Sequence, residues 1–180
     1  KTLLEEFPAS GFAEEAQFMV GYTGYLMSPK PRLDQSVTKK AIESLQLYIN
    51  LYPYNERVEE ANRLIDELRN KLVYKSFLSA KLYYDFENYK AAVIAITNSL
   101  QEHPDSKYRE DLMYMLLKSK YLLAINSVEE KKEERLSSAL DEYFTFVDEF
   151  PESEYKDEVD EFYETTAELL NYNKEETNIN

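Results

Sequence analysis

A short phrase built around proline recurs four times and constrains the fold more than any other feature of the chain. The phrases are Phe7-Pro8-Ala9-Ser10, Tyr52-Pro53-Tyr54-Asn55, His103-Pro104-Asp105-Ser106 and Phe150-Pro151-Glu152-Ser153, so the prolines lie 45, 51 and 47 residues apart. Each phrase places a ring before the proline and a helix-capping side chain two positions after it. A repeat of this length is typical of stacked helical hairpins. We therefore predict an all-α superhelix of stacked antiparallel helix hairpins.

The segments that end at the last three prolines have helical periodicity. Counted back from each proline, the same five positions trace one stripe of an α-helix with apolar or ring side chains. These are Ala41, Ile42, Leu45, Ile49 and Tyr52, then Ala92, Val93, Ile96, Leu100 and His103, then Ala139, Leu140, Tyr143, Val147 and Phe150. Each segment is expected to be the second helix of a hairpin, because proline disfavours helical geometry in the residue before it.

The segments that follow the prolines are expected to be the first helices of the hairpins. Ser10, Asn55, Ser106 and Ser153 are placed to cap them, and a pair of acidic residues in each first turn suits the positive end of the helix dipole. These pairs are Glu14-Glu15, Glu59-Glu60, Glu110-Asp111 and Asp157-Glu158. Residues 54–84 contain no glycine or proline and are expected to form one continuous helix, and residues 105–126 another.

Together the segments predict about seven helices in a single domain over residues 1–172. The hairpins span about 9–53, 54–104 and 105–151, with a half-repeat at 152–171 and a polar tail at 173–180 that is expected to fray. Lys1–Phe7 is expected to be the end of an earlier helix. Residues 28–34 hold two prolines and are expected to be an extended loop, and residues 85–88 a short turn. Ser127 and Glu130 have the spacing of a capping box.

Composition and charge exclude several classes of function. The net charge is −14, with 12 basic and 13 acidic side chains in residues 1–90 against 9 and 22 in residues 91–180. This field repels phosphate backbones, so nucleic acid is not an expected partner. The chain has no cysteine and one histidine, so neither a metal site nor a cofactor is expected. No apolar run approaches the roughly 18 residues that span a bilayer.

No constellation of catalytic residues is evident. His103 replaces the ring found before the other prolines, so a packing role is favoured over a role as base or ligand. Gly21 and Gly24 form the only close glycine pair and do not make a phosphate loop. Tyr48, Tyr114 and Tyr121 either line a peptide groove or fill the core, and the second is the more common role of such rings. We therefore expect a protein that is not an enzyme.

Three stretches of the sequence resemble one branch of the tetratricopeptide repeat proteins, the outer-membrane assembly lipoproteins called BamD, in a Bacteroidetes-like variant. They are the stretch from Asp34-Gln35-Ser36-Val37-Thr38 to Tyr52-Pro53, the stretch Tyr83-Tyr84 with Asn88-Tyr89-Lys90-Ala91-Ala92, and Phe150-Pro151-Glu152-Ser153-Glu154-Tyr155. The likeness covers roughly residues 5–170. The period departs from the ordinary 34-residue repeat because the first helices are long.

This resemblance implies a periplasmic protein that is lipid-anchored to the inner face of an outer membrane, through an acylated cysteine upstream of Lys1. It implies a non-enzymatic scaffold that binds the periplasmic domains of the β-barrel insertase, other assembly lipoproteins and unfolded barrel-protein peptides. The membrane would be contacted only through the lipid. The alternative is a general tetratricopeptide adaptor or a cell-envelope tethering protein with another client. A signal peptide before a lipid-bearing cysteine would favour the first.

The loop at residues 28–34 is the candidate site for a substrate peptide. It is longer than a tight turn requires, and Arg32 could pair with a terminal carboxylate while Tyr22 or Tyr25 packs against an aromatic side chain. Asp34 and Gln35 complete this candidate set. The alternative is a rigid turn in which Asp34 or Ser36 caps the next helix.

The acidic third hairpin is the candidate surface for docking a basic partner domain. Its acidic residues crowd around a single Lys156, and the alternative is a solvated surface without a partner. The residues of this candidate surface are Asp148, Glu149, Glu154, Tyr155, Asp157 and Glu158, with Glu152, Asp160 and Glu161 nearby.

Overall fold

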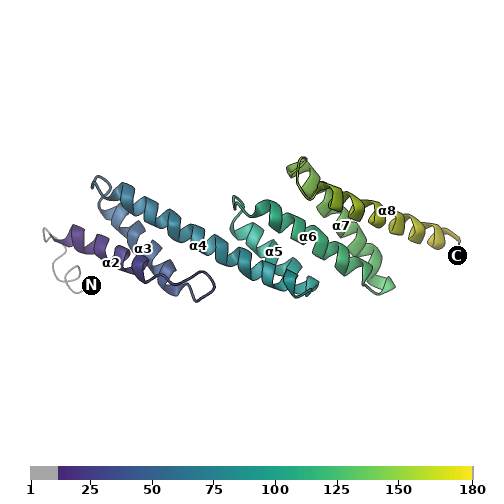
Figure 1. The fold of residues 1–180 in the computed structure, drawn as a ribbon, viewed down its shortest axis with the longest axis horizontal. Helices are drawn as coiled ribbons and strands as arrows, with labels where there is room; N and C mark the ends of the chain where they lie inside the picture. The colour runs from purple at the N-terminus through teal and green to yellow at the C-terminus, as the bar shows by residue number, and fades with distance from the viewer. Residues whose placement is uncertain (1–11, 180) are drawn as a thin grey trace. The chain divides into compact units, whose positions relative to one another are not determined.

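The computed structural model describes residues 12–179, with side chains for residues 12–170, and within that range it contains helices and turns but no strand (Figure 1). The all-α prediction is confirmed. In chain order the helices are α2 (Ala13–Met27), α3 (Ser36–Leu51), α4 (Val58–Asp85), α5 (Tyr89–Glu102), α6 (Arg109–Ile125), α7 (Glu129–Glu149) and α8 (Lys156–Ile179). The expected helix at Lys1–Phe7 and the first proline phrase lie outside the described residues.

The helices group into two compact units, residues 1–75 and residues 76–180. The first unit holds α2, α3 and the first part of α4, and the second holds the end of α4 with α5 to α8. As predicted, one uninterrupted helix fills most of residues 54–84. Helix α8 continues to Ile179, and the extent of the domain and the fraying of its tail stay predictions.

The last three proline phrases form the same turn. The ring residues Tyr52, His103 and Phe150 lie outside helical geometry, with φ of −130°, −137° and −129°. Their carbonyls accept the N–H groups of the capping residues three positions on.

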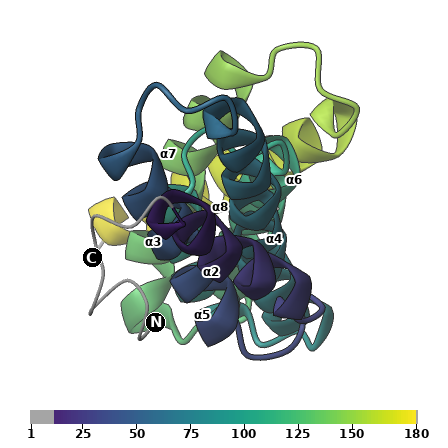
Figure 2. The same cartoon turned by 90° about the vertical axis from the view of Figure 1, so that its left-hand side faces the viewer.

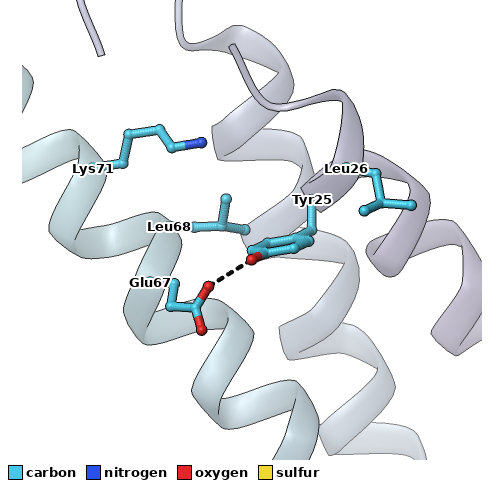
Figure 3. A pocket seen from close by; sticks show the side chains of 5 residues that line it. All are labelled: Tyr25, Leu26, Glu67, Leu68 and Lys71. Atoms are coloured by element: carbon cyan, nitrogen blue, oxygen red, sulfur yellow. Dashed lines mark hydrogen bonds between the residues drawn. The ribbon is translucent and has the colours of Figure 1, made fainter. Parts of the chain in front are cut away.

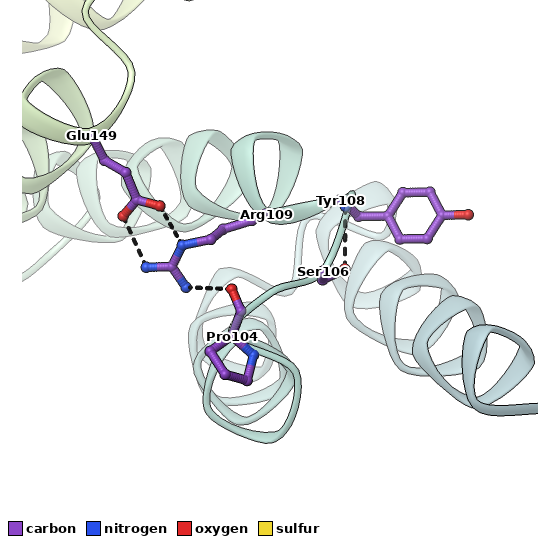
Figure 4. Close-up of polar contacts among 5 residues, drawn as sticks. All are labelled: Pro104, Ser106, Tyr108, Arg109 and Glu149. Carbon is purple, nitrogen blue, oxygen red and sulfur yellow. Dashed lines mark hydrogen bonds and ion pairs between the residues drawn. The ribbon is translucent and has the colours of Figure 1, made fainter. Parts of the chain in front are cut away.

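The predicted capping side chains bond within the turn that leads into each helix. Asn55 Oδ1 accepts the N–H of Arg57 at 2.8 Å, and Ser106 Oγ accepts that of Tyr108 at 3.1 Å (Figure 4). Ser153 Oγ does the same for Tyr155. Each α-helix then begins three residues later, so these bonds hold the turn before the helix, and the N-cap of α6 is Tyr108, which has no side-chain cap hydrogen bond.

In the first unit, α2 and α3 lie side by side, as both views show (Figure 1, Figure 2). Gly21 and Gly24 allow this approach: a Cβ at Gly21 would lie 2.7 Å from Leu45 Cγ, and one at Gly24 would lie 2.9 Å from Ala41 Cβ. The core contains buried residues of α2, α3 and α4. Its buried residues are Phe18, Ala41, Leu45, Tyr48, Ala61, Leu64, Ile65 and Leu68.

The second unit buries three apolar clusters between its helices. One joins α4, α5 and α6, another joins α6, α7 and α8, and the third lies at the far ends of α6, α7 and α8. The buried residues are Ala80, Ala92, Ile96, Leu112, Met115 and Leu116 in the first, Met113, Leu117, Phe146 and Val159 in the second, and Ala124, Leu136 and Leu170 in the third.

One expected capping motif is wrong. Ser127 does not cap α7, whose N-cap position is Val128. The Ser127 hydroxyl instead donates to the carbonyl of Leu123 on α6 and accepts from Arg135. The hydroxyl is held by the helix before it, so it is not free to serve the helix after it.

Candidate functional site

The loop between α2 and α3 is held from inside by Gln35. This side chain is 4% exposed, and its amide nitrogen donates to the carbonyls of Lys30 at 2.8 Å and Leu33 at 3.1 Å. Its amide oxygen accepts the hydroxyl of Thr38 at 2.6 Å. The Thr38 hydroxyl also lies 2.7 Å from Ser28 Oγ. Gln35 therefore satisfies loop carbonyls that have no helical partner, and its amide faces inward.

Two lysines of α4 fix the same loop from the outside. Lys71 Nζ donates to Ser28 Oγ at 2.7 Å, and Lys75 Nζ donates to the carbonyl of Leu33 at 2.6 Å. At the end of the loop, Asp34 Oδ1 accepts the N–H of Ser36 at 3.0 Å, as the capping alternative predicts. The hydrogen bonds from Ser36 lower the pKa of Asp34. Hydrogen bonds from the start of α3 and from α4 therefore hold the loop in place.

A ladder of rings leads along α2 to this loop. Phe18 stacks on Tyr22 with ring centroids 5.9 Å apart, and Tyr22 stacks on Tyr25 at 6.2 Å. The inner end of the ladder meets Tyr48 edge-on, and Arg57 lies over the Phe18 ring. The spacing of these α2 residues puts all three rings on one face of the helix.

The outer end of the ladder lines a pocket of about 320 Å³ (Figure 3). Its walls are Tyr25 and Leu26 of α2 and Glu67, Leu68 and Lys71 of α4. The Tyr25 hydroxyl donates to Glu67 Oε2 at 2.6 Å, and this hydrogen bond raises the pKa of Tyr25.

The charges around the pocket do not balance. Glu67 is paired with Arg63 at 2.8 Å, whereas the hydrogen bonds of Lys71 go to the uncharged oxygens of Ser28. Lys71 therefore leaves an excess positive charge beside an aromatic and aliphatic wall. This combination suits a ligand with an apolar group and a negative charge.

The residues of the predicted loop site are distributed unevenly around this pocket. Tyr25 lines it, and Tyr22 packs behind Tyr25 in the ladder. Arg32 and Asp34 are exposed on the loop and do not line the pocket, and Gln35 is buried beneath the loop. Sequence reasoning missed Lys71, because nothing in the periodicity of α4 indicates that this lysine faces the loop.

In the second unit, several residues of the predicted acidic surface are engaged in contacts with other side chains of the same unit. Glu149 forms a two-pronged ion pair with Arg109, which also reaches the carbonyl of Pro104 (Figure 4). The hydrogen bonds from Arg109 lower the pKa of Glu149. The Tyr155 hydroxyl donates to Asp111 at 2.7 Å.

Glu158 is held in the same way by α6. It accepts from Lys118 at 2.8 Å and from the Tyr114 hydroxyl at 2.6 Å. Burial acts to raise the pKa of Glu158, but these two hydrogen bonds outweigh it, and the net shift is downward. Burial and the hydrogen bond to Glu158 raise the pKa of Tyr114 to about 12. The Tyr114 ring also stacks on Tyr155 with centroids 4.0 Å apart.

Three of the predicted acidic residues remain turned to solvent. Asp148, Glu154 and Asp157 are exposed, and no ion pair joins them to another side chain in residues 12–170. They lie at the end of α7, in the following turn and at the start of α8. This smaller set is the part of the predicted surface that can meet a basic partner.

The paired acids have a role that sequence reasoning did not assign. Glu14 and Glu15 of α2 bond to Asn55 and Arg57 at the next phrase, and Asp111 of α6 bonds to Tyr155 at the phrase after that. In these two cases the acids therefore tie a first helix to the turn that leads into the next first helix, in addition to any effect on the helix dipole.

Neither a membrane span nor a metal centre is found in the part of the chain that the structure describes. No helix there has the length and apolar character needed to cross a bilayer. No group of three or more histidine, aspartate or glutamate side chains gathers there in a way that could hold a metal ion.

Comparison with known proteins gives one clear result. The family model YfiO, described as outer membrane lipoprotein, matches residues 1–136 and residues 77–178. The two matches overlap, as expected for repeats that can be aligned in more than one register. The comparison with curated proteins found no match. Because the family matches span most of the sequence and the fold is a helical repeat, the chain belongs to the YfiO family of outer membrane lipoproteins.

Proposed function

We propose that this protein is a non-enzymatic scaffold of the machinery that assembles outer-membrane β-barrels, where it binds the periplasmic domains of the insertase and unfolded barrel proteins. The observation that carries the proposal is the family match over residues 1–136 and 77–178. The family supports a role in outer-membrane assembly with protein partners. The anchoring lipid, the periplasmic location and the contact with other assembly lipoproteins are further parts of the proposal.

The pocket between α2 and α4 is the proposed site for the end of a barrel-protein peptide. An aromatic side chain of the peptide would pack against Tyr25 and Leu68, and its terminal carboxylate would pair with Lys71. The excess positive charge at Lys71 supports this orientation. Arg32, on the exposed loop, would add a longer-range attraction.

Fluorescence anisotropy with a labelled synthetic peptide tests this site. The peptide alternates polar and apolar residues and ends in phenylalanine, with either a free carboxylate or an amide. For the free carboxylate, Lys71→Ala is expected to weaken binding about fivefold, which corresponds to roughly 1 kcal/mol for a partly exposed ion pair. The amidated peptide should bind wild type and variant equally.

Two further variants serve as a control and as a second test in this experiment. Lys75→Ala removes a neighbouring lysine that contacts the loop but does not line the pocket, so it is the matched control. Arg32→Ala combined with Tyr25→Ala is expected to weaken both peptides. Equal binding by the wild type and this double variant would refute the peptide site.

The exposed acids Asp148, Glu154 and Asp157 are the proposed contact for a basic face of the insertase's periplasmic domains. Electrostatic complementarity accelerates association most strongly at low ionic strength. The association rate with purified periplasmic domains is therefore expected to fall as salt rises, and to fall less in a variant with all three acids changed to Asn or Gln. A rate that does not depend on salt would remove the electrostatic part of the proposal.

A further inference from the structure

The outer face of α2 is apolar and exposed. Met19 is 43% exposed and Val20 is 36% exposed, and Ala16 lies one turn earlier on the same side of the helix. Gln17 and Gly21, on the opposite side of α2, are buried against α3. The face formed by Ala16, Met19 and Val20 is therefore separate from the packing on α3, and none of its residues lines the pocket.

The positions of this face are buried in the next two repeats. Ala16, Met19 and Val20 lie 8, 11 and 12 residues after Pro8. The residues at the same positions are Ala61, Leu64 and Ile65 in α4 and Leu112, Met115 and Leu116 in α6. All six are at most 4% exposed. Those of α4 share an apolar cluster with residues of α3, and those of α6 share one with residues of α5. In both repeats, the helix that runs into the proline therefore covers this face of the helix that follows it.

The sequence before Pro8 matches the helices that cover this face in the other repeats. Leu3, Leu4 and Phe7 lie 5, 4 and 1 residues before Pro8. The residues at these positions before the other prolines are Tyr48, Ile49 and Tyr52, then Ser99, Leu100 and His103, then Phe146, Val147 and Phe150. The first position is buried in all three helices, and the other two are half-buried. Leu3 therefore holds a position that is buried in each repeat that the structure describes.

We propose that Ala16, Met19 and Val20 form the docking surface for a preceding helix of the same chain, a helix that ends at Phe7 and has residues 1–7 as its last turns. Leu3 is expected to meet Ala16, because the residues at these two positions share a buried cluster in α3 and α4 and again in α7 and α8. Earlier turns of the same helix would reach Met19 and Val20, since an antiparallel partner approaches the end of α2 as it is followed back along the chain.

The connection along the chain favours this occupant over another molecule. Only residues 8–11 separate Phe7 from Phe12, the first residue that the structure describes. The preceding segment is therefore held beside α2 at an effective concentration on the order of millimolar. A second copy of the chain carries the same net charge of −14 and is repelled. Terminal repeats of helical stacks have a polar outer face, so the apolar face of α2 is not that of a terminal repeat.

Cysteine labelling of the full-length protein tests whether this face is covered. Met19→Cys is reacted with a maleimide under native conditions, and mass spectrometry of the peptides follows the label at position 19. Tyr54→Cys is the exposed reference, because Tyr54 is 99% exposed. Leu64→Cys, at the position of α4 that corresponds to Met19, is the buried reference. We expect Met19→Cys to react at least tenfold more slowly than Tyr54→Cys.

Two neighbouring substitutions test which segment provides the cover. Leu3→Asp places a charge at the position that is buried in the other repeats, and it should accelerate labelling of Met19→Cys at least fivefold. Thr2→Asp adds the same charge one residue earlier, six residues before the proline. The residues at that position in the other repeats are Leu47, Asn98 and Thr145, and all are exposed. Thr2→Asp is therefore the matched control and should leave the rate unchanged. Labelling of Leu64→Cys should stay slow with both substitutions, because the rest of the fold stays intact.

Any of the following results would overturn the proposal. They are labelling of Met19→Cys as fast as that of Tyr54→Cys, protection that Leu3→Asp leaves intact, and protection that Thr2→Asp removes equally. Protection that is lost on dilution would identify a second copy as the occupant and would also overturn it. The experiments on the pocket change other residues and measure peptide binding, so failure of this inference and failure of the proposed function can be told apart.

Discussion

Replacement of Gly24 by alanine tests whether the close approach of α2 and α3 is a structural requirement. An added Cβ would lie 2.9 Å from the Cβ and 3.2 Å from the Cα of Ala41, which is itself buried. Alanine has no rotamer that moves its methyl away, so the two helices must separate by a few tenths of an ångström. The same helices carry Tyr25, Leu26 and the loop, so this packing also sets the pocket.

The expected magnitude follows from two opposing effects. Overpacking a tight core costs typically 1–3 kcal/mol, so about 2 kcal/mol is a fair estimate here. Alanine gains about 1 kcal/mol over glycine in helix propensity, which offsets part of this cost. Gly24→Ala should therefore lower the free energy of unfolding by about 1 kcal/mol.

Thr23→Ala is the matched control, because Thr23 is exposed on the same helix and alanine is the better helix former. It should raise the free energy of unfolding by about 0.5 kcal/mol. Urea titration followed by circular dichroism should then separate the two midpoints by roughly 0.5–1 M. A midpoint for Gly24→Ala equal to or above that of Thr23→Ala would refute the reasoning.

Three further changes have defined outcomes. Glu87 has φ of 56° in the turn after α4, a left-handed backbone geometry that glycine adopts at lower cost. Glu87→Gly should therefore raise the free energy of unfolding by about 1 kcal/mol in urea titration. A lower free energy of unfolding for this variant would contradict backbone strain at Glu87. The buried hydroxyl of Ser119 has no hydrogen-bond partner in residues 12–170, so Ser119→Ala should be neutral or stabilising in a thermal melt, and a loss above about 1 kcal/mol would point to an unseen partner. The lowered pKa of Glu158 means that its ionised form stabilises the fold above its ordinary pKa of 4.5 and that this stability is lost as pH falls through the lowered value. Glu158→Gln should therefore narrow the gap between melting temperatures at pH 7 and at about pH 3, and an unchanged gap would remove this contribution.

The repeat architecture could be predicted because the proline phrases impose local geometry. Proline excludes helix from Tyr52, His103 and Phe150, and the cap two residues after each proline bonds to the following turn, whatever the rest of the chain does. These constraints act over a few residues, so they can be read from the sequence. Helix periodicity then identified half of the buried residues of the second helices, namely Ala41, Leu45, Ala92, Ile96 and Ala139.

One position that is buried in all three second helices escaped the pattern, because its residue types do not match. Five residues before each proline stand Tyr48, Ser99 and Phe146, and all three are buried. Ser99 is accommodated by a hydrogen bond of 2.9 Å to Ser76 on α4. Tyr48 therefore belongs to the core, which confirms the more common role of such rings. Which residue type can be buried at this position depends on the side chain that it meets on another helix. That side chain is distant in sequence, so the sequence pattern does not reveal it.

The candidate sites could be predicted only in part, for the same reason. The loop and Tyr25 were found, but the lysine beside the pocket was not, because Lys71 is 43 residues from the Ser28 oxygens it contacts. The acidic surface was overestimated, because Arg109, Lys118 and Tyr114 engage Glu149 and Glu158 from an earlier helix. A cluster of acidic residues can be read from a sequence. Which of them are paired with basic or hydroxyl groups depends on how the helices pack.

Quantitative affinity purification from detergent-solubilised cell envelopes tests whether this protein acts in β-barrel assembly. The full-length protein is captured and the β-barrel insertase is measured by mass spectrometry, alongside a variant with Asp148, Glu154 and Asp157 each changed to lysine. We expect the insertase to co-purify with the wild type in near-stoichiometric amount and to be depleted at least fivefold with the charge-reversed variant. Absence of the insertase from the wild-type sample, with another client in its place, would contradict a role in barrel assembly.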